Sequence, residues 1–290
     1  MSAGRDDRGA GSFAREFSLE ATRPSAADIT ALAGILARGT QLYLSAVPTQ
    51  SFARHVEVAA ATRRAGLEPV AHLPARRFAS AGELADVLAR MRGDADLRCV
   101  LTVAGDAAAA GPFPDALALI QGGKLREAGI EEVGIAGYPE GHPSITADKL
   151  EAALDQKIAA ARAAGLNVHI VSQFSFDPDA IVAWLARLRK CGITVPVKVG
   201  MAGPTSIPSL LRYAKRCGVG ASLKGLVSGA ATSLLGHVGP DRIIDALAAA
   251  KGEIGAAHPH YFSFGGVVAT ARYAHETSQK AAAAHAVTAS

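Results

Sequence analysis

Two hydrophobic patterns alternate along the chain. Short apolar runs, in which side chains follow one another or alternate with small residues, are typical of strands, and each is followed by a longer stretch with apolar residues at helical spacing. Strands are predicted at residues 17–20, 42–45, 69–73, 99–103, 133–137, 168–173, 195–199 and 261–264. Helices are predicted at 25–38, 51–65, 80–91, 146–164, 208–217, 221–235 and 240–251. A further helix is predicted to end near residue 129, and two more to begin at about residues 178 and 267.

This alternation predicts the fold. Ser25 with Asp28 has the spacing of a capping box, and Gly39 and Gly66 end the first two helices. Strictly alternating strands and helices indicate a parallel sheet, and eight such units favour a closed barrel. A doubly wound sheet is the alternative, but no G-x-G-x-x-G follows the first strand. We therefore predict a single (β/α)8 TIM-type barrel with extra helices near the C-terminus.

The ends of the chain differ from its centre. Residues 1–14 are polar and Gly-rich without an apolar signal-peptide core, which predicts a disordered leader. The barrel is expected over 15–278, and the Ala-rich residues 279–290 are predicted to be a frayed tail. No apolar run reaches the length of a membrane span, so we expect a cytoplasmic protein that does not bind membranes.

Composition adds little to this picture. Hydrophobic residues make up 49% of the 290 residues and charged residues 19%, so a sizeable core is expected. The net charge of +4 comes from scattered basic residues without an aromatic-interleaved stripe, which fits an anionic small ligand at least as well as nucleic acid. Three cysteines without C-x-x-C spacing indicate buried or idle thiols in a reducing compartment. A homo-oligomer is left open.

Candidate chemistry lies where the predicted strands end. The run 137–143 (Gly-Tyr-Pro-Glu-Gly-His-Pro) is a loop stiffened by two prolines. Each polar residue alone has an ordinary explanation as a solvated strand end, a satisfied core histidine, a turn or a helix cap. Their shared position at the carboxyl end of a barrel, where such enzymes keep their active sites, favours a functional site. The residues are Glu20, Ser45, His72, Asp106, Tyr138, Glu140, His142 and Gln173.

Two kinds of catalysis find weak support. No H-E-x-x-H and no clustered acidic triad occurs, so no metal is predicted. No cysteine falls at a strand end, and Ser45 lacks a nucleophile elbow, which argues against a covalent intermediate.

Five motifs, taken in strand order, resemble the 5,10-methylenetetrahydrofolate reductase family from about residue 17 to the end. They are Phe-Ser-Leu-Glu20, Ala-His72-Leu, Gly105-Asp106, Tyr138-Pro-Glu-Gly-His142-Pro and Ser-Gln173-Phe-Ser-Phe-Asp177. The resemblance implies a barrel that holds FAD, takes a hydride from NADH or NADPH and passes it to the methylene carbon of 5,10-methylenetetrahydrofolate.

The resemblance also implies roles for single residues. Glu20 is expected to be the general acid that protonates folate N10, and burial at its strand end predicts a raised pKa. Asp106 is expected beside both pterin and flavin, as a catalytic and binding group. The other assignments are Gln173 and Tyr213 for substrate, Ser45 near the nicotinamide, and His72, Gly105, Tyr138 and His142 for flavin.

Departures from the family pattern leave the cofactor open. Ala104 stands where the family has a flavin-binding arginine before Gly-Asp. Lys157 is expected at the flavin phosphates, but counting back from Gln173 puts Ala161 there instead. FAD is therefore expected to be bound, loosely held or absent. The alternatives are direct hydride transfer from NAD(P)H to the folate, or a folate-binding barrel without redox activity. Glu20 argues against the last, because a binding protein needs no acid at N10.

Overall fold

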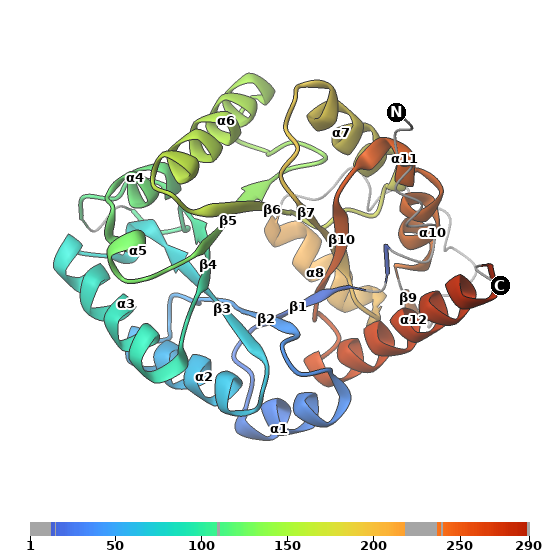
Figure 1. The fold of residues 1–290 in the computed structure, drawn as a ribbon, viewed down its shortest axis with the longest axis horizontal. Coiled ribbons are helices and arrows are strands. Elements are labelled where there is room, and N and C mark those ends of the chain that lie inside the picture. The colour runs from blue at the N-terminus through green and yellow to red at the C-terminus, as the bar shows by residue number, and fades with distance from the viewer. Residues whose placement is uncertain (1–12, 15, 109–110, 218–236, 239, 289–290) are drawn as a thin grey trace, which may run out of the picture.

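Eight parallel strands close into a barrel in the computed structural model, which describes residues 13–14, 16–108, 111–217, 237–238 and 240–288 (Figure 1). Around the barrel the strands follow the order β1-β10-β7-β6-β5-β4-β3-β2, which confirms the predicted TIM-type fold. Their bounds are β1 Ser18–Ala21, β2 Gln41–Leu44, β3 Glu68–Pro74, β4 Cys99–Val103, β5 Glu132–Gly137, β6 Asn167–Ser172, β7 Val197–Ala202 and β10 Ala257–Phe262.

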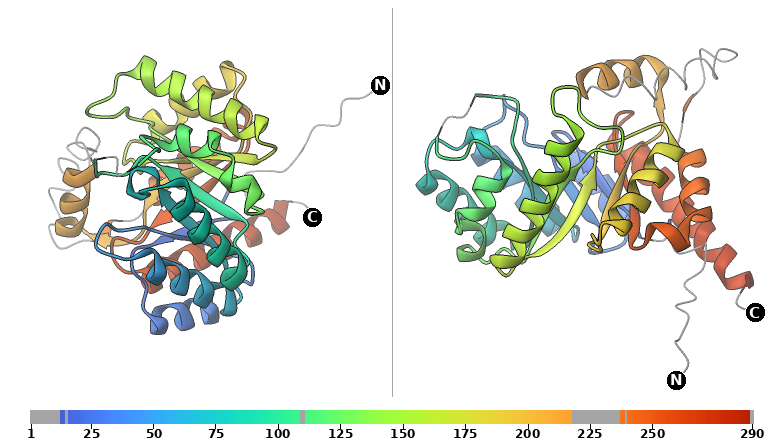
Figure 2. Two further views of the ribbon diagram at one scale, coloured as in Figure 1. Left: turned by 90° about the vertical axis from the view of Figure 1, so that its left-hand side faces the viewer. Right: turned by 90° about the horizontal axis from the view of Figure 1, so that it is seen from above.

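Helices form the outer ring, with one exception. Figures 1 and 2 together show α8 over the barrel mouth, inside the ring that the other helices make. A two-stranded antiparallel sheet of β8 (Thr205–Ser206) and β9 (His237–Val238) adjoins it. The helices are α1 Ala26–Ile35, α2 Phe52–Arg64, α3 Ala81–Ala95, α4 Ala116–Gln121, α5 Lys124–Glu127, α6 Ala147–Ala163, α7 Pro178–Lys190, α8 Ile207–Cys217, α10 Asp241–Ala249, α11 Lys251–Ile254 and α12 Val267–Thr288, with a 3₁₀ turn at Ala75–Arg77.

Strand alternation aims the functional residues inward. On β1, Leu19 and Ala21 are fully buried and pack against apolar residues of α1 and α12, outside the barrel. Because successive side chains of a strand point to opposite faces, Ser18 and Glu20 face the barrel interior. The apolar pattern of four residues thus fixes the direction of the Glu20 carboxylate.

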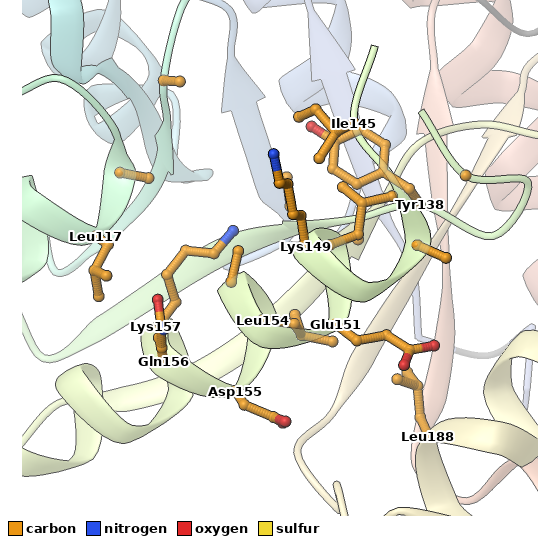
Figure 3. A pocket seen from close by; sticks show the side chains of 18 of the residues that line it. Leu117, Tyr138, Ile145, Lys149, Glu151, Leu154, Asp155, Gln156, Lys157 and Leu188 are labelled. Carbon is orange, nitrogen blue, oxygen red and sulfur yellow. The ribbon is translucent and has the colours of Figure 1, made fainter. Parts of the chain in front are cut away.

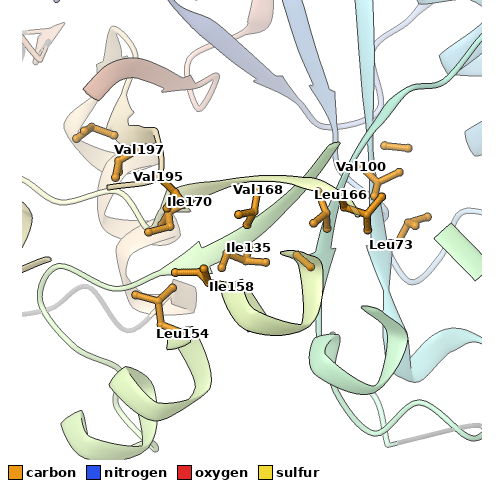
Figure 4. Close-up of a cluster of buried hydrophobic side chains, with 14 of the residues drawn as sticks. Leu73, Val100, Ile135, Leu154, Ile158, Leu166, Val168, Ile170, Val195 and Val197 are labelled. Atoms are coloured by element: carbon orange, nitrogen blue, oxygen red, sulfur yellow. The ribbon is translucent and has the colours of Figure 1, made fainter. Parts of the chain in front are cut away.

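The largest core lies between the barrel wall and its helices. Figure 4 shows Ile135 and Ile170 of β5 and β6 close to Leu154 and Ile158 of α6. Burying each such side chain contributes about 1.5–3 kcal/mol relative to leaving it exposed. This packing holds α6 against the strands and so fixes the helix face that borders the barrel mouth.

Local signals at helix ends are confirmed. The Ser25 side chain accepts a hydrogen bond from the Asp28 backbone at 3.1 Å, and the Ser25 backbone donates to the Asp28 carboxylate at 2.9 Å. This is the predicted capping box at the start of α1.

Some predicted boundaries differ from the structure. β10 begins at Ala257, four residues before the prediction, and ends at Phe262 rather than at Phe264. Helix α12 continues to Thr288, past the predicted boundary at residue 278, and Phe13 and Ala14, assigned to the leader, are buried. The helix predicted at 221–235 lies outside the described residues. Within the described part of the chain, no helix is long and apolar enough to cross a bilayer.

Candidate functional site

Glu20 lies at the carboxyl end of β1 and is surrounded by side chains from three other elements. The Ser45 hydroxyl donates to Glu20 Oε1 at 2.7 Å. The Nε2 atoms of His72 on β3 and His260 on β10 each lie 3.5 Å from Glu20 Oε2. The structure therefore brings together three residues predicted at strand ends, and adds His260, which was not predicted.

The direction of the Glu20 pKa differs from the prediction. Burial is the largest single influence and would raise this pKa, but His72, His260 and Ser45 together hold it below its ordinary value. Burial lowers the pKa of both histidines, because a charged imidazole is disfavoured away from water. The expected raised pKa was wrong because it considered burial without these partners.

A second hydrogen-bonded group lies inside the barrel and includes Tyr43, the register partner of Glu20 on β2. The Tyr43 hydroxyl lies 2.7 Å from His169 Nε2, and His169 Nδ1 lies 2.6 Å from a Glu132 carboxylate oxygen. The Tyr43 ring also meets the His260 ring edge-on, with centroids 4.7 Å apart, and Ser18 Oγ lies 2.8 Å from His260 Nδ1. These contacts fix the orientation of His260 toward Glu20.

The Glu20 carboxylate opens into a cavity of about 380 Å³, which we call the β1 pocket. Its lining includes Tyr213 of α8 and Phe264, whose rings stack with centroids 4.3 Å apart and planes at 18°. Phe264 in turn stacks on Phe262 at 5.6 Å. Stacked aromatic faces beside a carboxyl group suit a flat heteroaromatic ligand with a basic nitrogen.

A larger cavity of about 670 Å³, the α6 pocket, lies between the ends of β4 and β5 and helices α4, α6 and α7. Figure 3 shows Lys149 and Lys157 extending from α6 toward it, with Leu117 and Tyr138 at its sides. Gly137 allows the Trp184 ring to pack closely at this end of β5, since an added Cβ would lie 2.8 Å from that ring.

The two residues counted for the expected flavin-phosphate position lie in different surroundings. Ala161 is fully buried in the core, whereas Lys157 lines the α6 pocket. Burial lowers the pKa of the Lys157 ammonium, and Asp115 partly offsets this. An anion bound beside this ammonium would stabilise its charged form and compensate for the hydration lost on burial.

The α6 pocket meets several requirements of a dinucleotide such as FAD. It has apolar walls and four basic side chains for phosphates, Arg76, Lys149, Lys157 and Arg187, although four carboxylates also line it. Ala104 lines it, and Arg76 donates to the carbonyls of Pro114 at 2.7 Å and Gly105 at 3.4 Å beside that alanine. The residues present therefore fit FAD. The Arg76 guanidinium, from the 3₁₀ turn after β3, lies near Ala104, the position at which the family has an arginine.

The remaining predicted residues lie around the mouth but line neither pocket. Asp106 is exposed, and its charge raises the pKa of Tyr138, after burial as the main cause. The His142 ring meets Tyr138 edge-on at 5.3 Å. The Gln173 side-chain oxygen accepts from the Phe174 backbone at 3.1 Å, and Gly105 has a positive φ of 87°.

One cluster has metal-ligating side chains. Ligand atoms of Cys99, Glu132 and His169 lie within 4.8 Å of one another. Both ring nitrogens of His169 already face hydrogen-bonding partners, Tyr43 and Glu132. The prediction that no metal is needed stays a prediction.

Sequence reasoning missed His260, Tyr43 and His169. A signal for the first was present in His258-Pro259-His260, which puts two imidazoles on one face of a strand. The expectation that the chain lacks a His-x-His spacing, part of the argument against a metal, was wrong, and the predicted strand begins only at Tyr261. In the structure Pro259 pairs within β10 opposite Val199.

Comparison with known proteins gives one family. A family model described as methylenetetrahydrofolate reductase matches residues 24–223. Methylenetetrahydrofolate reductase 2 of Saccharomyces cerevisiae is 31% identical over 86 residues, which are 29% of this chain and 14% of the yeast protein. Methylenetetrahydrofolate reductase 1 of Schizosaccharomyces pombe is 34% identical over 87 residues, 30% of this chain and 14% of that protein. The matched segments thus span a small part of each relative.

Proposed function

Because this chain belongs to the methylenetetrahydrofolate reductase family, we propose that it reduces 5,10-methylenetetrahydrofolate to 5-methyltetrahydrofolate with NADH or NADPH, through FAD. The observation that carries the proposal is Glu20, a buried carboxyl at the floor of a pocket walled by stacked aromatic rings.

Glu20 acts as the general acid in this proposal. Its proton moves to N10 of the folate, the bond between N10 and the methylene carbon breaks, and an iminium forms at N5. A hydride then adds to the methylene carbon and leaves a methyl group on N5. Ligand in the β1 pocket displaces water from the carboxyl, which favours its protonated form. His72 and His260, 3.5 Å away, are the groups that can return a proton to Glu20.

The α6 pocket holds the dinucleotide in this proposal. Lys149 and Lys157 would bind phosphates there, and Tyr138 would border the ring system. His142, in edge contact with Tyr138, and the exposed Asp106 lie outside the lining of both pockets. Asp106 is assigned to stabilise the cationic form of a pterin that extends to the mouth. FAD held there would supply two-electron redox chemistry between NAD(P)H and the folate. Ser45 is assigned to the nicotinamide side, where its hydroxyl already touches Glu20.

A second candidate, direct hydride transfer from NAD(P)H without flavin, is favoured by Ala104. An alanine offers no charged hydrogen bond to a flavin, and the same pocket cations serve the phosphates of a nicotinamide dinucleotide equally well.

The test is NAD(P)H oxidation by the purified protein with 5,10-methylenetetrahydrofolate, with and without added FAD, together with the visible absorption of the protein. Folate-dependent oxidation that needs FAD supports the first candidate. Oxidation that is independent of FAD, by colourless protein, supports the second. Absence of folate-dependent oxidation under both conditions would reject both reductase functions.

A further inference from the structure

Two hydroxyl groups connect the Glu20 carboxylate with the protein surface. Thr22, in the loop after β1, is exposed, and its Oγ1 lies 3.1 Å from Ser45 Oγ. Ser45, directly after β2, is half-buried and donates to Glu20 Oε1 at 2.7 Å. Consecutive hydrogen bonds therefore run from solvent to the carboxylate through Thr22 and Ser45, which we call the hydroxyl pair.

The directions of these hydrogen bonds agree with one another. An ionised carboxylate only accepts, and a serine hydroxyl has one proton to donate. Because Ser45 gives its proton to the hydrogen bond with Glu20, Thr22 must be the donor in its contact with Ser45. The Thr22 oxygen can then accept from water. Both hydroxyl protons thus point toward the carboxylate, the arrangement that proton delivery from solvent requires.

The backbone holds the hydroxyl pair in place. The Ser45 backbone N–H donates to the carbonyl of Ala21, the residue before Thr22, at 3.1 Å. Ala21 is buried, and Ser263 Oγ donates to the Glu20 backbone carbonyl at 2.6 Å. The contact between the two hydroxyls therefore follows from the pairing of β1 with β2 and needs no long side chain.

The two imidazoles beside Glu20 lack such a connection to solvent. The Nε2 atoms of His72 and His260, which face the carboxylate, are both shielded from water. His260 Nδ1 faces the hydroxyl of Ser18, which is itself 1% exposed. The imidazoles can hold a proton next to Glu20, but a proton taken from water needs another way in.

The proposed reaction creates the need for this route. In the open pocket the pKa of Glu20 lies below its ordinary value, so the carboxyl group is ionised at neutral pH. A folate in the β1 pocket displaces water and favours the protonated form, so the proton is taken up when the ligand already covers the pocket. In an inference that rests on the proposed function, we propose that Thr22 and Ser45 deliver this proton from solvent to Glu20.

The transfer changes only O–H bonds. The Ser45 hydroxyl proton moves to Glu20 Oε1, the Thr22 hydroxyl proton moves to Ser45 Oγ, and a hydronium ion or buffer acid in solvent gives a proton to Thr22 Oγ1. Both hydroxyls are restored, Glu20 gains one proton, and the solvent acid becomes its conjugate base. Glu20 remains the catalytic acid, and Thr22 and Ser45 act through it.

The test is stopped-flow measurement of folate-dependent NAD(P)H oxidation under single-turnover conditions, in H2O and in D2O. Thr22→Val keeps the shape of the side chain and removes its hydroxyl. The rate should fall about tenfold, less than on loss of the acid itself, because water can bridge to Ser45 in place of the missing group. The solvent isotope effect should increase, because proton delivery then limits the rate. Dissociation constants for 5-methyltetrahydrofolate and NAD(P)H, measured by calorimetry, should not change.

Further variants separate proton delivery from a structural role. Thr22→Ser keeps the hydroxyl and should retain most of the wild-type rate. Loss of delivery lowers the rate at every pH, whereas a displaced Glu20 would also shift the midpoint of the pH dependence, since its distances to His72 and His260 would change. Thr30→Val removes a hydroxyl from an exposed position on α1 and should match wild type in rate and isotope effect.

An unchanged rate and isotope effect in Thr22→Val would overturn the inference and show that water reaches Glu20 through the pocket. An equal loss in Thr22→Ser, or a shifted midpoint in Thr22→Val, would also overturn it, and each of these results leaves the reductase function intact. A wild-type protein without folate-dependent NAD(P)H oxidation would instead reject the proposed function, and the role of the hydroxyl pair with it.

Discussion

The β1 pocket and the α6 pocket border the same barrel mouth but have different chemistry. The β1 pocket places the Glu20 carboxyl group beside stacked aromatic rings, and that carboxyl adjoins two buried imidazoles. The α6 pocket has apolar walls with lysines and contains no histidine among its lining residues. Among the lining residues, lysines occur only in the α6 pocket, together with Asp115, Glu140, Glu151 and Asp155. In the function proposed above, the β1 side of the mouth would transfer protons and the α6 side would bind phosphates.

The largest effect is expected from Glu20→Gln. The amide keeps the shape of the side chain but cannot donate a carboxyl proton, so folate turnover should fall by about 10²–10⁴-fold. Oxidation of NAD(P)H in the absence of folate needs no proton at N10 and should be preserved. Stopped-flow measurement of the two half-reactions would separate these steps. Folate turnover within a few-fold of wild type would mean that Glu20 is a structural strand end.

The second prediction concerns the stability of the barrel at acid pH, through the buried His55 of helix α2. His55 is 2% exposed, and burial lowers its pKa from 6.5 to about 4. The unfolded chain takes up the proton first as pH falls. Stability is therefore full above pH 6.5 and is lost between 6.5 and about 4, by about 3 kcal/mol from this residue.

Urea unfolding across this pH range would check the prediction. His55→Gln removes the titrating group and should make the free energy of unfolding less dependent on pH. His275→Gln, at a partly exposed position on α12, should leave the dependence as in wild type. An unchanged slope in His55→Gln would show that His55 does not control acid stability.

A third prediction concerns the α6 pocket. Lys157→Met keeps the length of the side chain and removes its charge, so dinucleotide affinity should fall by about 1.5–3 kcal/mol, the value of a charged hydrogen bond. Fluorescence titration with FAD and with NAD(P)H would measure this loss and show which dinucleotide uses the pocket. Lys190→Met, on an exposed position of α7, is the control. Equal affinity in Lys157→Met and wild type would remove Lys157 from the binding site.

The features that could be predicted from the sequence are those set by residues close together along the chain. The eight strands follow from their apolar pattern, and Glu20, Ser45 and His72 follow from their place at strand ends. The direction of the Glu20 pKa did not follow, because it depends on His260, which reaches the site only when β10 closes the barrel beside β1. The choice between Lys157 and Ala161 likewise required the rotation of α6 against the strands.

The smallest effect is expected from Ala104→Arg. An arginine at this position would add a charged hydrogen bond toward the α6 pocket, which Ala104 lines. Arg76 already donates to the adjacent Gly105 carbonyl, so a second guanidinium would meet a like charge and part of the gain would be cancelled. Retention of FAD through gel filtration should therefore improve by less than about tenfold. In the background of Arg76→Ala the same substitution should improve retention more, because the repulsion is removed. An equal gain in both backgrounds would show that Arg76 is too distant to influence FAD binding at the α6 pocket.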